Sequence, residues 1–253
     1  QFDATLFACH VITPAVLLAA APQAAPYLYE AERDAVQKEL DSLLQSPLLK
    51  GIKANALLPS GILGDCIVDE ISNNNVDLIV AGTHGRTGLR RLLLGSAVEE
   101  VCRVATCPVL TIGPDLPVPP AKYRRILVPT DLSDASLRSL PFVVRLASEY
   151  GALVTVVHVL PEETAGNPDT KVLSEPVYRS MRHKLEPLLG DLKTDFVIES
   201  GDTVETILKV AFKKDADLIA MGIRGTFLPG FHLRTSVAYR VVAGAHCPVV
   251  TCR

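Results

Sequence analysis

The sequence lacks the features expected of a protein that spans a membrane or coats nucleic acid. No apolar run reaches the roughly 18 residues that a membrane span needs. The most apolar stretch, at 11–22, is interrupted by Thr13 and Pro14. The net charge is −3 at pH 7, so a broad basic face for nucleic acid is not expected either. We therefore expect neither a membrane nor a nucleic acid among the partners.

Cysteine pairs with metal-binding spacing are also missing. The six cysteines form no CxxC pair and no Cys/His cluster with zinc spacing, so no metal site is predicted. Buried free thiols in a reducing compartment are the favoured interpretation, which predicts a cytoplasmic protein. The cysteines are Cys9, Cys66, Cys102, Cys107, Cys247 and Cys252.

Several nucleotide and hydrolase motifs are absent. There is no GxxxxGK[ST] of a P-loop, and no GxGxxG after a first strand, which disfavours a classical dinucleotide fold. Without a GxSxG elbow, a hydrolase triad has no nucleophile. Paired carboxylates suited to hydrolysis are not recognisable, so we assign no catalytic residue and expect any ATPase activity to be slow.

The sequence contains an internal repeat. Three blocks of the first half recur in the same order in the second half, which indicates a tandem duplication. The first block recurs at an offset of 148 and the other two at 140, so the first copy carries eight extra residues between them. The paired blocks are 1–14 with 149–162, 76–85 with 216–225, and 106–112 with 246–252.

The second copy gives the order of elements. Buried strands alternate with amphipathic helices, and this pattern predicts an α/β fold with a doubly wound parallel sheet covered by helices. Ser133 or Asp134 is expected to cap the first helix. Expected strands lie at 124–131, 152–160, 194–200, 216–222 and 247–252, and expected helices at 133–150, 173–189, 203–214 and 236–244.

The duplication predicts two domains, at 1–112 and 124–253, joined by a proline-rich linker at 113–123. The first copy has no counterpart of residues 124–148, and therefore lacks its first strand and helix. Because the first strand of a doubly wound sheet is usually central, its absence leaves open edges. We expect the natural chain to extend about 25 residues upstream, by analogy with the second copy. The alternative is that another chain supplies the strand.

A glycine-rich loop follows the strand VDLIVA. In open α/β sheets ligands bind beyond the carboxyl ends of strands, and glycines let backbone N–H groups approach an anion. Gly95 and Ser96 then begin a helix whose N-terminus favours negative charge. These features, with nearby Arg86, Arg90 and Arg91, suit a phosphate. The alternative is a plain turn, with Ser96 and Glu99 forming a capping box.

The spacing Gly82-x2-Gly85-x9-Gly95-Ser96, within GTHGRTGLRRLLLGSAVEEVCRVATCPVLTI, resembles the signature of the ATP-binding universal stress proteins. ILVPTDLSD and VVHVLPE in the second copy are similar to the first two strands of that family. The resemblance covers essentially the whole chain. It implies two tandem five-stranded sheets with strand order 3-2-1-4-5. It also implies pairing through the last strands, either between the two copies (CPVLTI with CPVVTC) or in a homodimer.

The resemblance further implies an ATP site, with Mg²⁺ arriving on the nucleotide. The second copy departs from the signature, because Thr235 replaces the third glycine and its Cβ would crowd a phosphate. We therefore expect the first copy to bind ATP and the second to bind weakly or not at all. The implied residues of the first copy are Val11, Gly82, His84, Gly85, Gly95, Ser96 and Val98. Those of the second are Pro129, Thr130, Asp131, Val159, Gly222, Gly225 and Ser236.

Three functions are compatible with these patterns. The first is a stress-response regulator that binds ATP and acts through conformation or choice of partner. The second is a nucleotide-free dimerisation or interaction scaffold of the same fold, which Thr235 favours in the second copy. The third, a nucleotidyl transferase or ATP pyrophosphatase, requires an HxGH or SGGxDS-like motif that the sequence lacks. His10 and His158, at equivalent positions, are expected to be structural.

Overall fold

The computed structural model describes residues 4–14, 23–83, 95–114, 116, 122–164, 170–223 and 236–253. The chain divides into two compact units, Gln1–Asn75 and Val76–Arg253, which we describe separately. The second unit contains the end of the first copy together with the whole second copy. The domain boundaries at 1–112 and 124–253 stay a prediction from the sequence repeat, and the compact units divide at a different point of the chain.

The first unit is a two-stranded parallel sheet with two helices. Strand β1 (Thr5–Cys9) pairs with β2 (Lys53–Leu57) in register from Thr5↔Lys53 to Cys9↔Leu57. Helix α2 (Ala25–Leu44) and helix α3 (Leu63–Asn74) contribute the buried residues Val36, Leu40 and Ile71. A short 3-10 helix, Pro47–Leu49, precedes β2. Strand β1 lies in the block 1–14, which the sequence repeat matches to 149–162 of the second copy.

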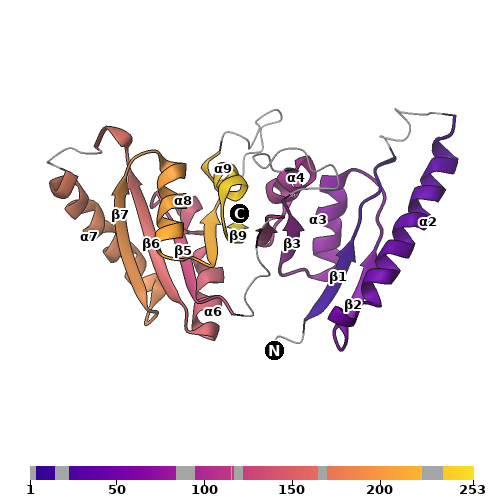
Figure 1. Cartoon of the computed structure of the whole chain (residues 1–253), viewed down its shortest axis with the longest axis horizontal. Helices are drawn as coiled ribbons and strands as arrows, with labels where there is room; N and C mark the ends of the chain where they lie inside the picture. The colour runs from indigo at the N-terminus through magenta and orange to yellow at the C-terminus, as the bar shows by residue number, and fades with distance from the viewer. Residues whose placement is uncertain are drawn as a thin grey trace. The chain divides into compact units, whose positions relative to one another are not determined.

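The second unit is built on a seven-stranded sheet of order β3-β4-β9-β8-β5-β6-β7 (Figure 1). The five strands of the second copy follow the order 3-2-1-4-5, with β5 in the centre, as the family resemblance implied. All neighbours are parallel except β4 and β9. The strands are β3 (Ile79–Gly82), β4 (Val109–Ile112), β5 (Arg125–Pro129), β6 (Leu153–Leu160), β7 (Thr194–Ser200), β8 (Leu218–Gly222) and β9 (Val249–Cys252).

Helices cover both faces of this sheet. Leu127 of β5 belongs to a buried cluster with α8 and α9, whereas Ile126 and Val128 belong to one with α6 and α7. This alternation follows from the period of two along a strand, and it explains why β5 is apolar throughout. The helices are α4 (Ser96–Val104), α5 (Asp134–Leu137), α6 (Leu140–Tyr150), α7 (Thr170–Leu189), α8 (Thr203–Lys213) and α9 (Val237–Gly244), with a 3-10 turn at Glu162–Thr164.

The single helix predicted over 133–150 is two helices. Ser133 caps α5 by accepting a hydrogen bond from Ser136 N, and α6 begins again at Leu140. Pro141 explains the break, because a proline nitrogen cannot donate to the carbonyl four residues earlier but fits the first turn of a new helix. The other predicted elements of the second copy lie where the pattern placed them, within a few residues at their ends.

The antiparallel pair β4–β9 joins strands of the two copies. Val109 faces Thr251, and Thr111 faces Val249, across the ladder. The side chain of each threonine also contacts the backbone of the facing strand. Thr111 Oγ1 donates to Val249 O at 2.9 Å, and Thr251 Oγ1 lies 3.5 Å from Val109 O. The equivalent last strands of the two copies thus pair within one chain, around an approximate twofold axis.

The cysteines fit the predicted interpretation only in part. All six are free, and Cys102, Cys247 and Cys252 are buried, but Cys9 is exposed and Cys66 and Cys107 are half-buried. Burial raises the pKa of Cys102 to about 11 and those of Cys247 and Cys252 to about 12. Among the described residues no group of His, Cys, Asp and Glu could hold a metal ion, and no helix is both long and apolar enough to cross a membrane.

We expect Thr111→Val to lower the free energy of unfolding by about 1 kcal/mol, because it removes a buried hydrogen bond while keeping a β-branched shape. Thr251→Val should cost less, since the hydroxyl of Thr251 makes a longer contact. Urea denaturation of both variants measures the difference. Equal losses would show that the hydroxyl of Thr111 contributes nothing specific to the ladder.

We expect iodoacetamide at pH 8 to leave Cys102, Cys247 and Cys252 of the folded protein unmodified. A thiol with a pKa near 12 is about one part in ten thousand thiolate at that pH, and the thiolate is the reactive form. In concentrated guanidinium chloride all six cysteines should react. Peptide mass spectrometry reads both states, and rapid labelling of Cys252 in the native protein would contradict the described burial.

Candidate functional site

The glycine signature of the first copy is described at its two ends. Gly82 is the last residue of β3, and the next residue, Thr83, is buried. Thr83 N donates to Ile112 O, and Gly95 N donates to Thr83 O, both at 2.9 Å. The two ends of the signature therefore meet beyond the carboxyl ends of β3 and β4. Of the predicted site residues, His84 and Gly85 lie outside the described residues, as does Gly225 of the second copy.

In the alternative that the sequence left open, Ser96 caps α4, and the structure does not place it at the N-cap position. Gly95 is the N-cap residue, and no side chain makes a capping hydrogen bond there. Ser96 is the first helical residue, and Glu99 N donates to Gly95 O at 2.9 Å as part of the helical ladder. Because its N-cap residue is a glycine, that residue supplies no side chain to the N–H groups of the first turn of α4, and such a helix N-terminus favours an anion.

Gly95 has room for a side chain as far as the described residues are concerned. A Cβ added there would meet Thr83 O at 3.5 Å, an ordinary van der Waals distance. Its backbone, with φ −61° and ψ 143°, is open to any residue type. Neither packing nor backbone conformation among the described residues therefore demands a glycine at this position.

The other predicted residues of the first copy are less favourably placed. Val98 packs against the buried cluster that contains α8 and α9, so its side chain serves the core. Val11 lies in the first unit, next to the buried Ile12, whose N–H donates to Pro59 O at 3.0 Å. Val11 belongs to a different compact unit from Gly82, Gly95 and Ser96, and its role on the base side of the site stays a prediction.

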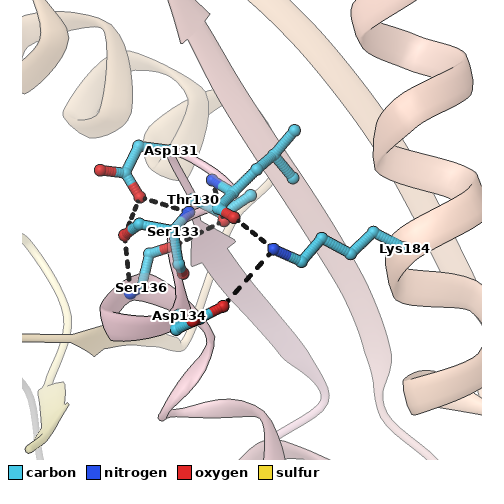
Figure 2. Close-up of polar contacts among 7 residues, drawn as sticks. Thr130, Asp131, Ser133, Asp134, Ser136 and Lys184 are labelled. Carbon is cyan, nitrogen blue, oxygen red and sulfur yellow. Dashed lines mark hydrogen bonds and ion pairs between the residues drawn. The ribbon is translucent and has the colours of Figure 1, made fainter.

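In the second copy the loop after β5 is held by its own hydrogen bonds (Figure 2). Asp131 Oδ1 accepts from both the N–H and the hydroxyl of Ser133, at 3.0 and 2.5 Å. Thr130 Oγ1 contacts Ser136 Oγ at 2.9 Å and accepts from Leu132 N at 2.9 Å. Thr130 and Asp131, predicted to face a nucleotide base, thus form a preorganised turn together with the cap of α5.

Two residues from other elements fix the same loop. Lys184 of α7 donates to Leu132 O at 2.7 Å and lies 3.6 Å from the carboxylate of Asp134 (Figure 2). Leu132 itself has a positive φ of 63°, an unfavourable conformation for a leucine. On the other side, His158 Nδ1 lies 2.8 Å from Thr130 O. The structural role expected for His158 is consistent with this contact.

Gly222 ends β8 and is required by packing. An added Cβ would lie 1.9 Å from Ala135 O and 2.8 Å from Ser136 C, so α5 presses directly on this glycine. The absence of a side chain at this position is therefore explained by a neighbouring helix of the same copy. Pro129, which ends β5, is buried, and Val159 is half-buried against the cluster that contains α8 and α9.

The helix that follows in the second copy is capped by its own side chain. Ser236 is the N-cap of α9, and its Oγ accepts from Tyr239 N at 3.2 Å. Ser96 is the equivalent residue of the first copy, 140 positions earlier, but it is the first residue of α4 rather than its N-cap. The hydroxyl of Ser236 thus satisfies an N–H group at the start of α9, whereas the N-cap residue of α4, Gly95, has no side chain.

Sequence patterns missed Lys184 and the contact between α5 and Gly222. Lys184 lies 52 residues from the carbonyl that it binds and belongs to no motif, so no local signal identifies it. For Gly222 the signal was ambiguous, because close backbone packing and approach of a ligand both require a missing Cβ. His158 was singled out, since His10 occupies the same place in the first copy, but its contact with Thr130 O was not predicted.

Comparisons with known proteins agree with the fold and the duplication. A family model described as the Universal stress protein family matches residues 1–113 and 122–253. A universal stress protein of Methanocaldococcus jannaschii is 32% identical over 138 residues, which cover 51% of this chain and 81% of that protein. One from Thermus aquaticus is 32% identical over 142 residues, covering 52% and 99%.

A solved structure extends the similarity to nearly the full length. The crystal structure of a universal stress protein from Archaeoglobus fulgidus has a TM-score of 0.70 and 24% sequence identity. The match covers 98% of this chain and 87% of that one. At this level of identity the likeness concerns the fold, and it spans both copies.

We expect Gly222→Ala to lower the free energy of unfolding by about 2 kcal/mol or more, because the new methyl group overlaps the backbone of α5. Gly95→Ala should change it by less than about 0.5 kcal/mol, because the space beside Thr83 O is sufficient. Thermal and urea unfolding of the two variants give the comparison. A stable Gly222→Ala variant would mean that α5 moves away at little cost.

Proposed function

Since this chain belongs to the universal stress protein family, we propose that it is a stress-response regulator whose first copy binds ATP. Binding would act through the conformation of the protein or its choice of partner. The observation that carries the proposal is Gly95, a glycine that nothing among the described residues requires, placed at an open helix N-terminus. A ligand that approaches the backbone closely accounts for it.

In this proposal the phosphates lie against the first turn of α4. Its N–H groups and helix dipole favour negative charge, and the hydroxyl of Ser96 is in place to donate to an oxygen atom. His84 and Gly85 would complete the phosphate side, Val11 would serve the base side, and Mg²⁺ would enter bound to the nucleotide. Gly82, at the end of β3, brings the loop to the edge of the sheet where such ligands bind.

The second copy is proposed to work without a nucleotide. Three of its features support this: Ser236 occupies an N–H group of α9, Thr235 replaces the third glycine, and α5 fills the space beside Gly222. Its role would then be structural, as the partner that holds β4 through β9. This is the scaffold function, here confined to one half of the molecule.

Location and assembly complete the proposal. Six free cysteines suit a reducing compartment, and we place the protein in the cytoplasm on that ground. Because β4 and β9 already pair within the chain, a homodimer through these strands is not needed to complete the sheet.

We expect Gly95→Val to abolish ATP binding while leaving the melting temperature of the ligand-free protein within about 2 °C of the original. The branched side chain would fill the space proposed for the phosphates. Ser236→Ala, a matched change at the other copy, should lose about 1 kcal/mol of stability through its missing cap but bind ATP unchanged. Calorimetric titration with ATP measures both, and undiminished binding by Gly95→Val would locate the site elsewhere.

A thermal-shift series separates the regulator from the scaffold. With ATP at a hundred times its dissociation constant, linkage predicts a gain of about 2.7 kcal/mol in stability. No shift in melting temperature at millimolar ATP would favour a protein in which neither copy binds nucleotide. A shift that disappears in Gly95→Val and persists in Ser236→Ala supports a site in the first copy alone.

A further inference from the structure

The outer edge of β7 is available for pairing. Within the described part of the chain β7 pairs with β6 alone and ends the seven-stranded sheet (Figure 1). Val154 N donates to Lys193 O, and Gly201 N donates to Leu160 O, so the odd-numbered residues of this segment turn their backbone groups toward β6. The even-numbered residues therefore turn theirs outward. They are Thr194, Phe196, Ile198 and Ser200.

A cavity of about 460 Å³ lies beside the first half of this edge. One wall comes from α7 and the other from the start of β7, where the rings of Tyr178 and Phe196 meet edge to face with centroids 6.3 Å apart. The residues that line the cavity are Tyr178, Arg182, Glu186, Leu189, Gly190, Leu192, Thr194, Asp195 and Phe196. A side chain of an added strand would meet the rings of Tyr178 and Phe196 there, bordered by the charged groups of Arg182 and Glu186.

The two faces of β7 differ in character. Phe196 and Ile198 pack on the side of α6 and α7, whereas Val197 packs on the side of α8. Asp195 and Glu199 share the face of Val197, because side chains alternate along a strand. An added strand would continue both faces, with apolar side chains beside Phe196 and polar ones beside the two acids.

The charges along the edge decide which polar side chains fit. Lys214, the C-cap residue of α8, pairs with Asp195 at 2.6 Å, and on α7 Arg182 pairs with Glu186. No ion pair within the described residues joins Glu199. The strand therefore presents an uncompensated negative charge on its α8 side, and a lysine or arginine directly opposite would be stabilised.

We propose that the outer edge of β7 binds an extended peptide segment of a partner protein, in which apolar residues alternate with basic ones. The peptide adds a strand to the sheet, its apolar side chains continue the Phe196 and Ile198 side, and its basic side chains face Glu199 and Asp195. Backbone hydrogen bonds supply affinity, and the alternation supplies specificity. This interaction does not involve the nucleotide site.

The test uses fluorescence anisotropy with the full chain and labelled seven-residue peptides of alternating valine and lysine. We expect these to bind at least about tenfold more tightly than matched valine–glutamate peptides, and the preference to shrink as salt rises. Glu199→Lys should reverse the preference. Asp34→Lys, an equal change of charge on α2 in the first unit, should leave it unaltered.

Two further controls separate strand addition from simple charge attraction. Alternate N-methylation of the valine–lysine peptide removes its donors while keeping its charge, and should abolish binding. Thr194→Pro removes an outward N–H at the first residue of an edge strand, where proline is tolerated, and should weaken binding with an unchanged melting temperature. Hydrogen exchange should slow at the outward N–H groups of β7 when the peptide is bound.

Several outcomes would overturn the proposal. These are no binding at millimolar peptide, equal affinity for both charge patterns, or binding that N-methylation leaves intact. Self-association of the chain that the peptide displaces and Thr194→Pro abolishes would make a second copy the occupant of this edge. ATP titration of the same samples reports on the nucleotide site independently, so failure of one proposal is distinguishable from failure of the other.

Discussion

The antiparallel contact between β4 and β9 is the constraint on which the second unit depends. The strands β3 and β4 have four residues each and form only a parallel pair, which is too little to be stable alone. Through β9 they join a complete five-stranded sheet and share its buried core. The position of Gly82, Thr83 and the start of α4 is therefore secured by residues of the other copy.

The same glycine signature has two physical meanings in the two copies. At Gly222 the missing Cβ makes room for the backbone of α5, and at Gly95 it leaves space that the described protein does not fill. The serine that follows the third signature position caps its helix in one copy and not in the other. The two copies thus share the glycine positions but differ in what occupies the space beside them and in whether the following serine caps its helix.

Much of the fold was predictable because burial on both faces leaves a plain pattern. Runs such as 218–222 are apolar without interruption, and the strand order was implied by the family resemblance. The features that escaped prediction depend on single distances between segments remote in the chain. The helix break before Leu140 depends on Pro141, which the helical pattern of 133–150 did not reveal. The N-cap of α4 is Gly95, one residue before the serine considered from the sequence. The contact of Lys184 with Leu132 O has no sequence signal.

The direction of β4 relative to β9 has a consequence for how the two copies can communicate. Strands β3 and β4 run antiparallel to β8 and β9. The carboxyl ends of β3 and β8 therefore point in opposite directions along the strands of one sheet. Gly82 and Gly222 therefore open onto different sides of the unit, and no single ligand can bridge them. The contacts that connect the two copies within this unit are instead the β4–β9 ladder and the packing of Val98 of α4 against the cluster that contains α8 and α9.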